Sequence, residues 1–540
     1  MFYKLLYFFF VYFIFATCYG QKNYEYYRWN ESNKVYEFDF YGKNPSLVLD
    51  SLNRVGYYTL EIDSTYMDKI YLNKGKNYLN VWVKNEEIFK DKNFHPTKNL
   101  DSIISKYIQT TNENGFTFSQ VKLVPKGYIN NEQRIEIEVN LGDKRKIDKV
   151  KAEGYSKLSK GFIKHQLGLK QNKIYNENLL SNASHVLQNS NYISQIQPPQ
   201  TLFKSDSTIV YIYPSKLKSN YFDGIIGFGN DDEGKFRLNG NVLLELNNTF
   251  NSFEQIRLNW ISTANKNTTL DFKVKIPYLF QTPIGSETQL KIFKQDSLFV
   301  DLNLNQRLFF HINQNSNLGG NISYKTSNYL FDDENVNVKY DDYTKIGFGL
   351  NYQFYQKHPL TLMEGKSYLN VFANSISRKE NNYSLTEDYD NKKTKQLEFG
   401  LDTYRIFKLI NKHYIKSSIN VRGLFDKNKK YSENELYRFG GFGSLRGFNE
   451  ESIYANLYGI GSIEYRFIPN EGFYVNIFGD YAFSENKRIN LNKNFIGIGA
   501  GLSFMTKLGI FNLSYAVGKT DNTPFDFDNS KIHFGILSQF

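Results

Sequence analysis

The residue types that most often carry catalysis or metal binding are sparse in this chain of 540 residues. There is one cysteine, Cys18, and the seven histidines are scattered without metal-ligand spacing and without a neighbouring nucleophile motif. Those histidines are His95, His165, His185, His311, His358, His413 and His533. The sequence therefore predicts a protein that is not an enzyme, with no metal site and no cofactor.

A glycine-rich stretch at residues 437–448 offers a different chemistry. It reads Tyr-Arg-Phe-Gly-Gly-Phe-Gly-Ser-Leu-Arg-Gly-Phe and carries two arginines, Arg438 and Arg446. Glycines let the backbone fold tightly, and a guanidinium matches a carboxylate in a planar, forked geometry. The stretch is suited to a charged contact inside a protein, although a surface hairpin loop is the alternative interpretation.

The N-terminus has the layout of a secretory signal peptide. An apolar run at residues 5–16 follows Lys4 and precedes small residues, which predicts a signal peptide over residues 1–20 with cleavage before Gln21. A lipoprotein cleavage at Cys18 is the alternative. The run is too short to cross a bilayer as a helix. The mature chain would then hold no cysteine and could use neither disulfides nor thiolate chemistry.

The composition combines many aromatic residues with a polar average. The chain has 42 Tyr and 46 Phe against 3 Trp and 11 Pro, and its mean hydropathy is -0.52. This combination suits strands with one apolar face, above all a transmembrane barrel with a wet interior. The net charge of +11 is compatible with an anionic partner or with lysines in the lumen and at the rim. Nothing in the sequence supports nucleic-acid binding.

Residues 21–217 consist of a repeated unit. In each unit apolar residues at helical spacing are followed by two strands, which is typical of a small helix-on-sheet module. The helical runs lie at residues 45–56, 99–115 and 176–188. We expect three modules, at residues 21–76, 77–143 and 144–217, the first of them incomplete because it lacks an obvious first helix.

From residue 218 to residue 540 apolar and polar residues alternate with period two, over strands of about ten residues or more, longer than in a soluble sandwich. About eleven such strands precede the glycine-rich stretch and about five follow it. The predicted fold class is an all-β transmembrane barrel of about 16 antiparallel strands, preceded by small α+β modules. Closure is required because no unpaired backbone edge is tolerated in hydrocarbon.

One further glycine-rich run, Gly497 to Gly501, superficially suggests a phosphate-binding loop. Its glycines alternate with Ile496 and Ile498 inside a predicted strand. Small residues that face the lumen and leave room for an inserted loop explain the run better.

The modules, the barrel and the Arg-Gly-Phe loop between the eleventh and twelfth strands together resemble the BamA/TamA superfamily of outer-membrane assembly proteins, whose periplasmic modules are POTRA domains. Downstream of the loop, Gly461-Ser-Ile-Glu464 with Pro469, and then Phe478-Gly-Asp480, are similar to the family's motifs on the next two strands. Ala482 is a departure, because the family often has glycine there. The resemblance covers essentially the whole mature chain.

The resemblance implies that the loop folds into the barrel and that Arg446, Gly447 and Phe448 form a latch. Arg446 would then meet Glu464, Asp480 or both on the inner wall. The alternation independently sends both carboxylates inward, where a charge avoids the cost of facing lipid. Solvated lumen charges without special pairing are the alternative.

In function, the resemblance implies a non-enzymatic assembly or translocation factor in the Gram-negative outer membrane, with its modules in the periplasm. Client polypeptides would add as strands at module edges and at a lateral seam between the barrel strands at 221–230 and 531–540. The expected partners are outer-membrane lipid, unfolded client outer-membrane or secreted polypeptides, and a periplasmic accessory protein. The expected seam residues are Gly224, Gly227, Gly229, Gly535 and Phe540.

Two alternatives remain open at this point. Within the family, a two-partner-secretion transporter exports a dedicated substrate, but such transporters usually carry two modules and a plug helix, so about three modules favour the TamA type of assembly factor. From a different class, a passive porin-like or surface-binding barrel would leave the modules unexplained. The modules themselves could also be mere spacers.

Overall fold

The computed structural model describes residues 24–30, 32–42, 45–57, 60–74, 80–98, 100–129, 132–230, 236–262, 267–296, 298–330, 341–358, 360, 365–381, 393–506, 510–528 and 530–539. The expected signal peptide and Phe540 lie outside these residues. The chain divides into two compact units, Met1–Lys146 with Asn172–Asn178, and Ile147–Gln171 with Leu179–Phe540.

The first unit begins with a sheet of four strands in the order β2-β1-β4-β3. Its elements are β1 (Tyr24–Asn30), β2 (Val35–Gly42), α2 (Pro45–Arg54), β3 (Glu61–Tyr66) and β4 (Lys69–Asn73). The helical run predicted at 45–56 corresponds to α2, whose apolar side covers one face of the sheet. The hairpin of β1 and β2 was not predicted. Strand β2 occupies the place before α2 where the repeat would have a first helix.

The second sheet of this unit has the order β6-β5-β8-β7. Its elements are β5 (Val81–Lys84), α3 (Glu86–Phe89), β6 (His95–Thr97), α4 (Leu100–Glu113), β7 (Gln120–Ile129) and β8 (Glu132–Asn140). Apolar residues of α4 and of the two central strands form its core, namely Val81, Val83, Leu100, Ile135 and Ile137.

A third small sheet, β10-β11-β9, belongs to the same unit as the barrel. Its elements are β9 (Lys149–Ala152), the π-helix η1 (Phe162–Gln166), α5 (Glu177–Gln188), β10 (Ile193–Phe203) and β11 (Thr208–Lys216). The module is fixed to the barrel turns by a stacked ring pair, Phe162 and Phe253, whose centroids are 4.0 Å apart. Gln166 also donates to the carbonyl of Gln314 over 2.7 Å. The three module boundaries stay predictions.

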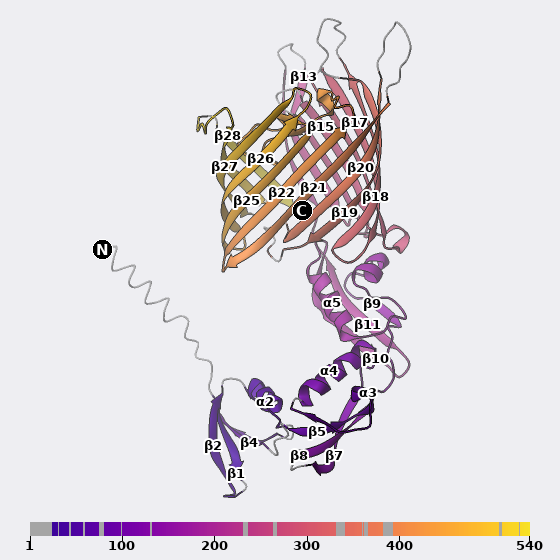
Figure 1. Cartoon of the computed structure of the whole chain (residues 1–540), viewed down its shortest axis with the longest axis vertical. Helices are drawn as coiled ribbons and strands as arrows, with labels where there is room; N and C mark the ends of the chain where they lie inside the picture. The colour runs from indigo at the N-terminus through magenta and orange to yellow at the C-terminus, as the bar shows by residue number, and fades with distance from the viewer. Residues whose placement is uncertain are drawn as a thin grey trace, which may run out of the picture. The chain divides into compact units, whose positions relative to one another are not determined.

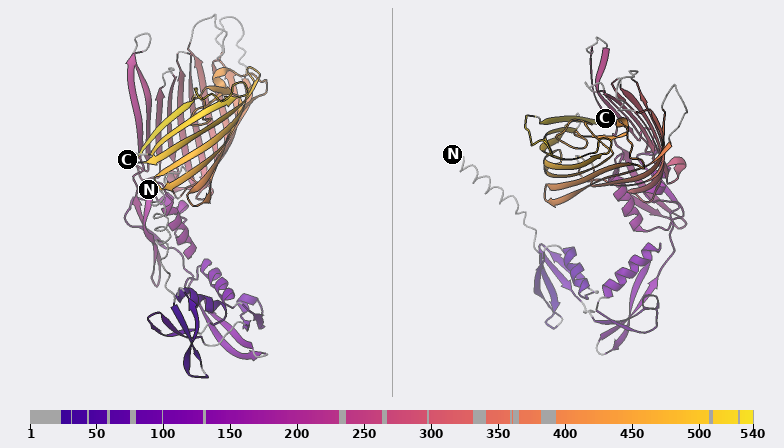
Figure 2. Two further views of the ribbon diagram at one scale, coloured as in Figure 1. Left: turned by 90° about the vertical axis from the view of Figure 1, so that its left-hand side faces the viewer. Right: turned by 45° about the horizontal axis from the view of Figure 1, so that its top comes forward.

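The remaining strands close into one antiparallel barrel of sixteen (Figures 1 and 2). Eleven precede the glycine-rich stretch and five follow it, so the predicted fold class is confirmed. The strands are β12 (Tyr221–Asn230), β13 (Phe236–Asn247), β14 (Gln255–Ser262), β15 (Asn267–Ile276), β16 (Ile284–Gln295), β17 (Phe299–His311), β18 (Ser316–Tyr329), β19 (Tyr343–Gln356), β20 (Ser367–Glu380), β21 (Lys393–Ile410), β22 (His413–Asp426), β25 (Leu457–Asn470), β26 (Phe473–Asn486), β27 (Leu491–Met505), β28 (Ile510–Thr520) and β29 (Lys531–Gln539).

The period-two pattern of the sequence separates an apolar outer face from a polar inner face. On β17, for example, Leu304 and Leu308 are exposed on the outside, whereas Asp301 and Arg307 are buried on the lumen side. Backbone pairing around the ring satisfies the strand amides, and the outer apolar side chains match a hydrocarbon environment. No helix among the described residues is long and apolar enough to cross a membrane.

Because the two faces differ in polarity, a new charge on each of two neighbouring residues of β17 should change the stability of the barrel to different extents. Leu304→Lys places an ammonium on the lipid face and should lower the free energy of unfolding from lipid vesicles by about 2–4 kcal/mol. Asn305→Lys places the same group in the polar lumen, beside Gln289 and Ser323 on the paired strands, and should change it little. Urea titrations of the refolded protein measure the free energy of unfolding of both variants. Equal losses in the two variants would contradict the assignment of Leu304 to the lipid face and Asn305 to the lumen.

Candidate functional site

The candidate site is built by the segment that joins the eleventh and twelfth barrel strands, residues 427–456, which we call the lumen loop. It contains a short 3-10 turn, η3 (Glu433–Glu435), and a two-stranded hairpin of β23 (Tyr437–Phe439) and β24 (Ile453–Ala455). Residues 440–452, which include the glycine-rich residues 440–448, connect the two short strands. The loop is therefore more ordered than a plain connection, and it contacts the inner wall of the barrel on several sides.

Arg446 is clamped by both carboxylates that the resemblance named. Its Nε and Nη2 donate to Oδ2 and Oδ1 of Asp480 over 2.8 and 2.6 Å, a forked, two-point contact. Its Nη1 donates to Oε2 of Glu464 over 2.8 Å. The side chains of Arg446, Glu464 and Asp480 are 13%, 7% and 0% exposed, so water screens the charges weakly.

Neighbouring side chains complete the clamp. Ser462 accepts from Nη2 of Arg446 over 2.8 Å and donates to Asp480 over 2.5 Å. Arg466 donates to the second oxygen of Glu464 over 2.6 Å, so this carboxylate lies between two guanidinium groups. The guanidinium carbon of Arg446 lies 3.5 Å from the ring centre of Phe478. Nearly every polar atom of the clamp thus has a partner, as a buried charge requires.

The alternation of β25 and β26 explains why these residues meet. Ser462 and Asp480 face each other directly in the register of the two strands, and Glu464 lies two residues further along β25. Residues two apart share a face, so the three side chains project into the lumen together. The outward neighbours Ile463 and Ile477 are exposed.

Two glycines let the loop approach the wall closely. Gly447 has a φ of +88°, and a Cβ at this position would lie 2.7 Å from the carbonyl carbon of Val517 on β28. A Cβ at Gly497 would overlap the carbonyl oxygen of Arg446. The predicted role of Gly497 to Gly501, making room for an inserted loop, thus matches the contact seen at Gly497.

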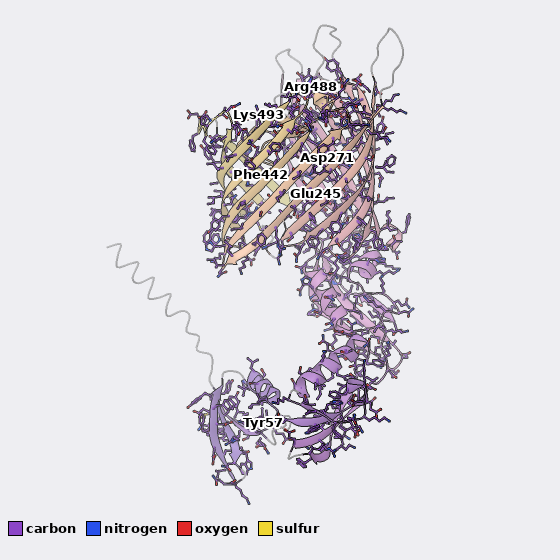
Figure 3. All side chains as sticks on the ribbon, in the orientation of Figure 1. Tyr57, Glu245, Asp271, Phe442, Arg488 and Lys493 are labelled. Carbon is purple, nitrogen blue, oxygen red and sulfur yellow. The ribbon has the colours of Figure 1, made fainter. Side chains whose placement is uncertain are left out.

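An apolar cluster packs around the clamp. Phe448 meets Phe495 edge to face, with ring centres 5.4 Å apart, and Phe439 stacks on Tyr458 at 4.5 Å. Ala482, the departure from the family pattern, is fully buried in this cluster, where its methyl group packs with the loop. Phe442 lies within the height of the barrel in Figure 3. The centre of its ring is 5.5 Å from the centre of the His533 ring.

A second anchor of opposite polarity holds the other part of the lumen loop, and sequence reasoning missed it. Glu435 of η3 is 0% exposed and pairs with Lys345 of β19 at 2.6 Å and with Arg378 of β20 at 3.4 Å. Gln396 of β21 donates to the same oxygen over 2.6 Å. The available signal was weak: two cations at inward positions of neighbouring strands, with no motif pointing to a loop carboxylate.

Two more loop residues contact the same side of the lumen. The guanidinium carbon of Arg438 lies 3.6 Å from the ring centre of Phe293 on β16. Tyr437 donates its hydroxyl to Glu398 of β21 over 2.7 Å. The loop therefore reaches from β16, β19, β20 and β21 to β25, β26, β27 and β28. It crosses the lumen.

The expected seam between the first and last strands is short. Within the described residues, β12 and β29 pair only through Tyr221 with Gln539 and Phe222 with Ser538. By contrast β12 pairs with β13 along its whole length, including Gly224, Gly227 and Gly229. Gly535 of β29 pairs with Asn512 of β28. Phe540, the last expected seam residue, lies outside the described residues.

A group of three or more His, Cys, Asp or Glu side chains that could hold a metal ion is not found in the described part of the chain. The contacts that the site does show are ion pairs and hydrogen bonds. Such contacts can hold a loop in place and can be exchanged for contacts with water or with another chain.

A family model and two solved structures with TM-scores above 0.5 agree with this architecture. A family model described as haemolysin secretion/activation protein ShlB/FhaC/HecB matches residues 218–503. The structure of CdiB from Acinetobacter baumannii is similar over 92% of this chain and 96% of that chain, with a TM-score of 0.54 and 15% identity. The structure of CdiB from Escherichia coli is similar over 92% of this chain and 96% of that chain, with a TM-score of 0.53 and 13% identity. The structure of BamA from Haemophilus ducreyi lacking POTRA domains 1-3 aligns over 85% of this chain and 99% of that chain, with a TM-score of 0.49 and 15% identity. No curated protein matches the chain in sequence.

Removal of the latch arginine should destabilise the barrel. Arg446→Ala leaves Asp480 and one side of Glu464 buried without a cation, so we expect a loss of about 3–5 kcal/mol of unfolding free energy. The temperature at which the folded gel band converts to the unfolded band reports this loss. Arg488→Ala is the matched control, because Arg488 lies at the barrel end opposite to the third module (Figure 3) and has a 3.3 Å contact to Glu433. It should cost at most about 1 kcal/mol. An unchanged barrel in Arg446→Ala would exclude the clamp.

The close approach at Gly497 gives a steric test that leaves every charge in place. Gly497→Ala should push the loop off β27 and lower the unfolding free energy by about 1–3 kcal/mol. Gly479→Ala, on the neighbouring strand, is the control because a Cβ there meets nothing within 4 Å. Tyrosine fluorescence during urea unfolding in detergent micelles compares the two variants, and identical curves would mean that the loop does not rest on Gly497.

Proposed function

The chain belongs to the family of haemolysin secretion/activation proteins ShlB/FhaC/HecB, and on that basis we propose that it exports a dedicated polypeptide client. It is a β-barrel protein of the Gram-negative outer membrane, in the BamA/TamA superfamily of assembly and translocation factors. The observation that carries the finer proposal is the match to a family of secretion/activation proteins. The lumen loop supports it, because the loop crosses the barrel and is held at each side by ion pairs. In this proposal the chain acts without enzymatic chemistry.

The lumen loop has the properties of a removable plug. The barrel strands are hydrogen-bonded to one another without help from the loop, whose two anchors are side-chain contacts. Displacing the loop therefore breaks two charge clusters, the ion pair between Glu433 and Arg488 and two apolar clusters, while it leaves the strand ladder intact. Charged groups released into a water-filled lumen are solvated again, which offsets part of the cost.

Two cavities support a route for a client through the barrel. One of about 730 Å³ lies at the barrel mouth beside the third module and is lined by residues of both, among them Phe162, Tyr192 and Tyr278. Another of about 540 Å³ lies between the lumen loop and the wall formed by β15 to β21.

The modules fit the role of client receivers on the periplasmic side. Their sheets have unpaired outer strands, and an extended polypeptide can add to such an edge by main-chain hydrogen bonds. Export would start with an unfolded client held at the modules and would continue through the lumen once the loop moves. A periplasmic accessory protein that keeps the client unfolded is a further partner of this scheme.

General assembly of outer-membrane proteins is the second candidate, and one observation favours it. The two residue pairs between β12 and β29, within the described residues, form a weak contact in an otherwise continuous ring. A client strand could insert there sideways into the membrane by pairing with the free part of β12. Dedicated export takes precedence because the family model that matches the barrel is that of secretion proteins.

Deletion of the coding sequence, followed by proteomics of the medium and of the outer membrane, separates the two candidates. Dedicated export predicts that one or a few secreted proteins disappear from the medium and return on complementation, while the outer-membrane barrels are unchanged. General assembly predicts the loss of many barrels from the membrane. A wild-type profile in both fractions would contradict both candidates and would favour a passive barrel.

A further inference from the structure

The cavity of about 730 Å³ at the barrel mouth differs in charge from the cavity beside the lumen loop. Four lysines line it, and its described lining residues include no Asp or Glu. The lysines are Lys275, Lys357, Lys366 and Lys408. The cavity beside the lumen loop is lined by six Lys or Arg and five Asp or Glu, so its charges nearly cancel. We call the cavity with the uncompensated lysines the mouth cavity.

Two carboxylates close to the mouth cavity are committed to other groups. Glu254, which lies between two lining residues in the sequence, accepts from two backbone N–H groups of its own turn over 2.6 and 2.9 Å. Glu287 lies 2.6 Å from Lys273 and 4.0 Å from Lys275, so its main ion pair is with Lys273. The positive charge of the mouth cavity is therefore only partly compensated by these neighbours.

Three of the four lysines lie at adjoining ends of three neighbouring strands. Lys357 follows directly after β19, and Lys366 lies directly before β20, the strand that pairs with β19. The N–H of Lys366 donates to the carbonyl of Gln356, the last residue of β19, over 2.8 Å. Lys408 lies near the end of β21 that pairs with the start of β20. Like charges on adjacent strands repel one another, so a bound anion would relieve an unfavourable arrangement.

The wall of the mouth cavity that comes from the third module is held firmly against the barrel. Lys357 donates from Nζ to the carbonyl of Ser190, just after α5, over 2.8 Å. Tyr278, in the turn after β15, donates its hydroxyl to Gln166 of η1 over 2.9 Å. These contacts act together with the stacked rings of the module and the barrel turn. The cavity is therefore formed before a ligand arrives, which reduces the cost of binding.

The position and the size of the mouth cavity limit what it can bind. Lys275 lies on the same face of β15 as Lys273, which pairs with Glu287, whereas Phe272 on the opposite face is exposed on the outside of the barrel. The lysines are thus on the lumen side, which membrane lipid does not reach. A volume of about 730 Å³ falls in the range of sites for ligands much larger than one carboxylate.

We propose that the mouth cavity binds an acidic segment of an unfolded polypeptide, with several Asp or Glu side chains placed among the four lysines. The ammonium groups would donate charge-assisted hydrogen bonds to the carboxylates. Their attraction would also raise the rate at which such a segment enters the barrel mouth. That the segment belongs to an exported client rests on the proposed function, whereas the preference for acidic side chains rests on the lining of the cavity.

Two labelled peptides that differ only in charge, hexaglutamate and hexaglutamine, test the site on the full-length chain in a nonionic detergent. Fluorescence anisotropy should show saturable binding of hexaglutamate, about tenfold or more tighter than that of hexaglutamine. The double variant Lys366→Gln with Lys408→Gln should weaken hexaglutamate binding about tenfold, since it removes two ammonium groups and keeps the contact of Lys357 with the module. Added salt should weaken binding to the unchanged chain.

The matched control is the double variant Lys379→Gln with Lys393→Gln. It removes two lysines that are paired at the opposite ends of the same two strands and line neither cavity, so hexaglutamate binding should be unchanged. Equal binding of the two peptides, or equal losses in the two double variants, would overturn the proposal. Displacement of hexaglutamate by an equal concentration of inorganic pyrophosphate would overturn it too, because the cavity would then be a site for a small anion. These outcomes do not depend on whether the deletion strain loses a secreted protein.

Discussion

The structure depends on one electrostatic contact, a guanidinium held between two buried carboxylates on the inner wall of the barrel. Arg446 enters from a loop, and Asp480 and Glu464 project from two neighbouring strands. None of the three would be stable in this place alone, because an unpaired buried charge is strongly unfavourable. The contact therefore fixes the position of the loop against β25 and β26.

Much of this arrangement follows from local rules. Period-two alternation determines which residues of a barrel strand face lipid, so the inward placement of Asp480 and Glu464 could be predicted from β25 and β26 alone. The close approach at Gly497 was also readable, since small residues in a strand leave room for another backbone. The partner of Arg446 came from the family resemblance, because alternation identifies a face but not what lies across a lumen.

Other features were beyond local reasoning for physical reasons. The anchor of Glu435 joins a loop residue to Lys345 and Arg378, which are distant in sequence and share no motif with it. Only the curvature of the closed sheet brings them together. The β1–β2 hairpin was missed because a helix was looked for at that place in the repeat. The sequence alone also favours general assembly over dedicated export, and the family match to secretion proteins shifts that balance.

The two anchors of the lumen loop also differ in their order along the chain. Glu435 binds β19 and β20, which precede the loop, whereas Arg446 binds β25 and β26, which follow it. Through the loop, strands that are distant in the chain and lie on different sides of the barrel are therefore joined by two charged anchors, in addition to the hydrogen bonds between neighbouring strands.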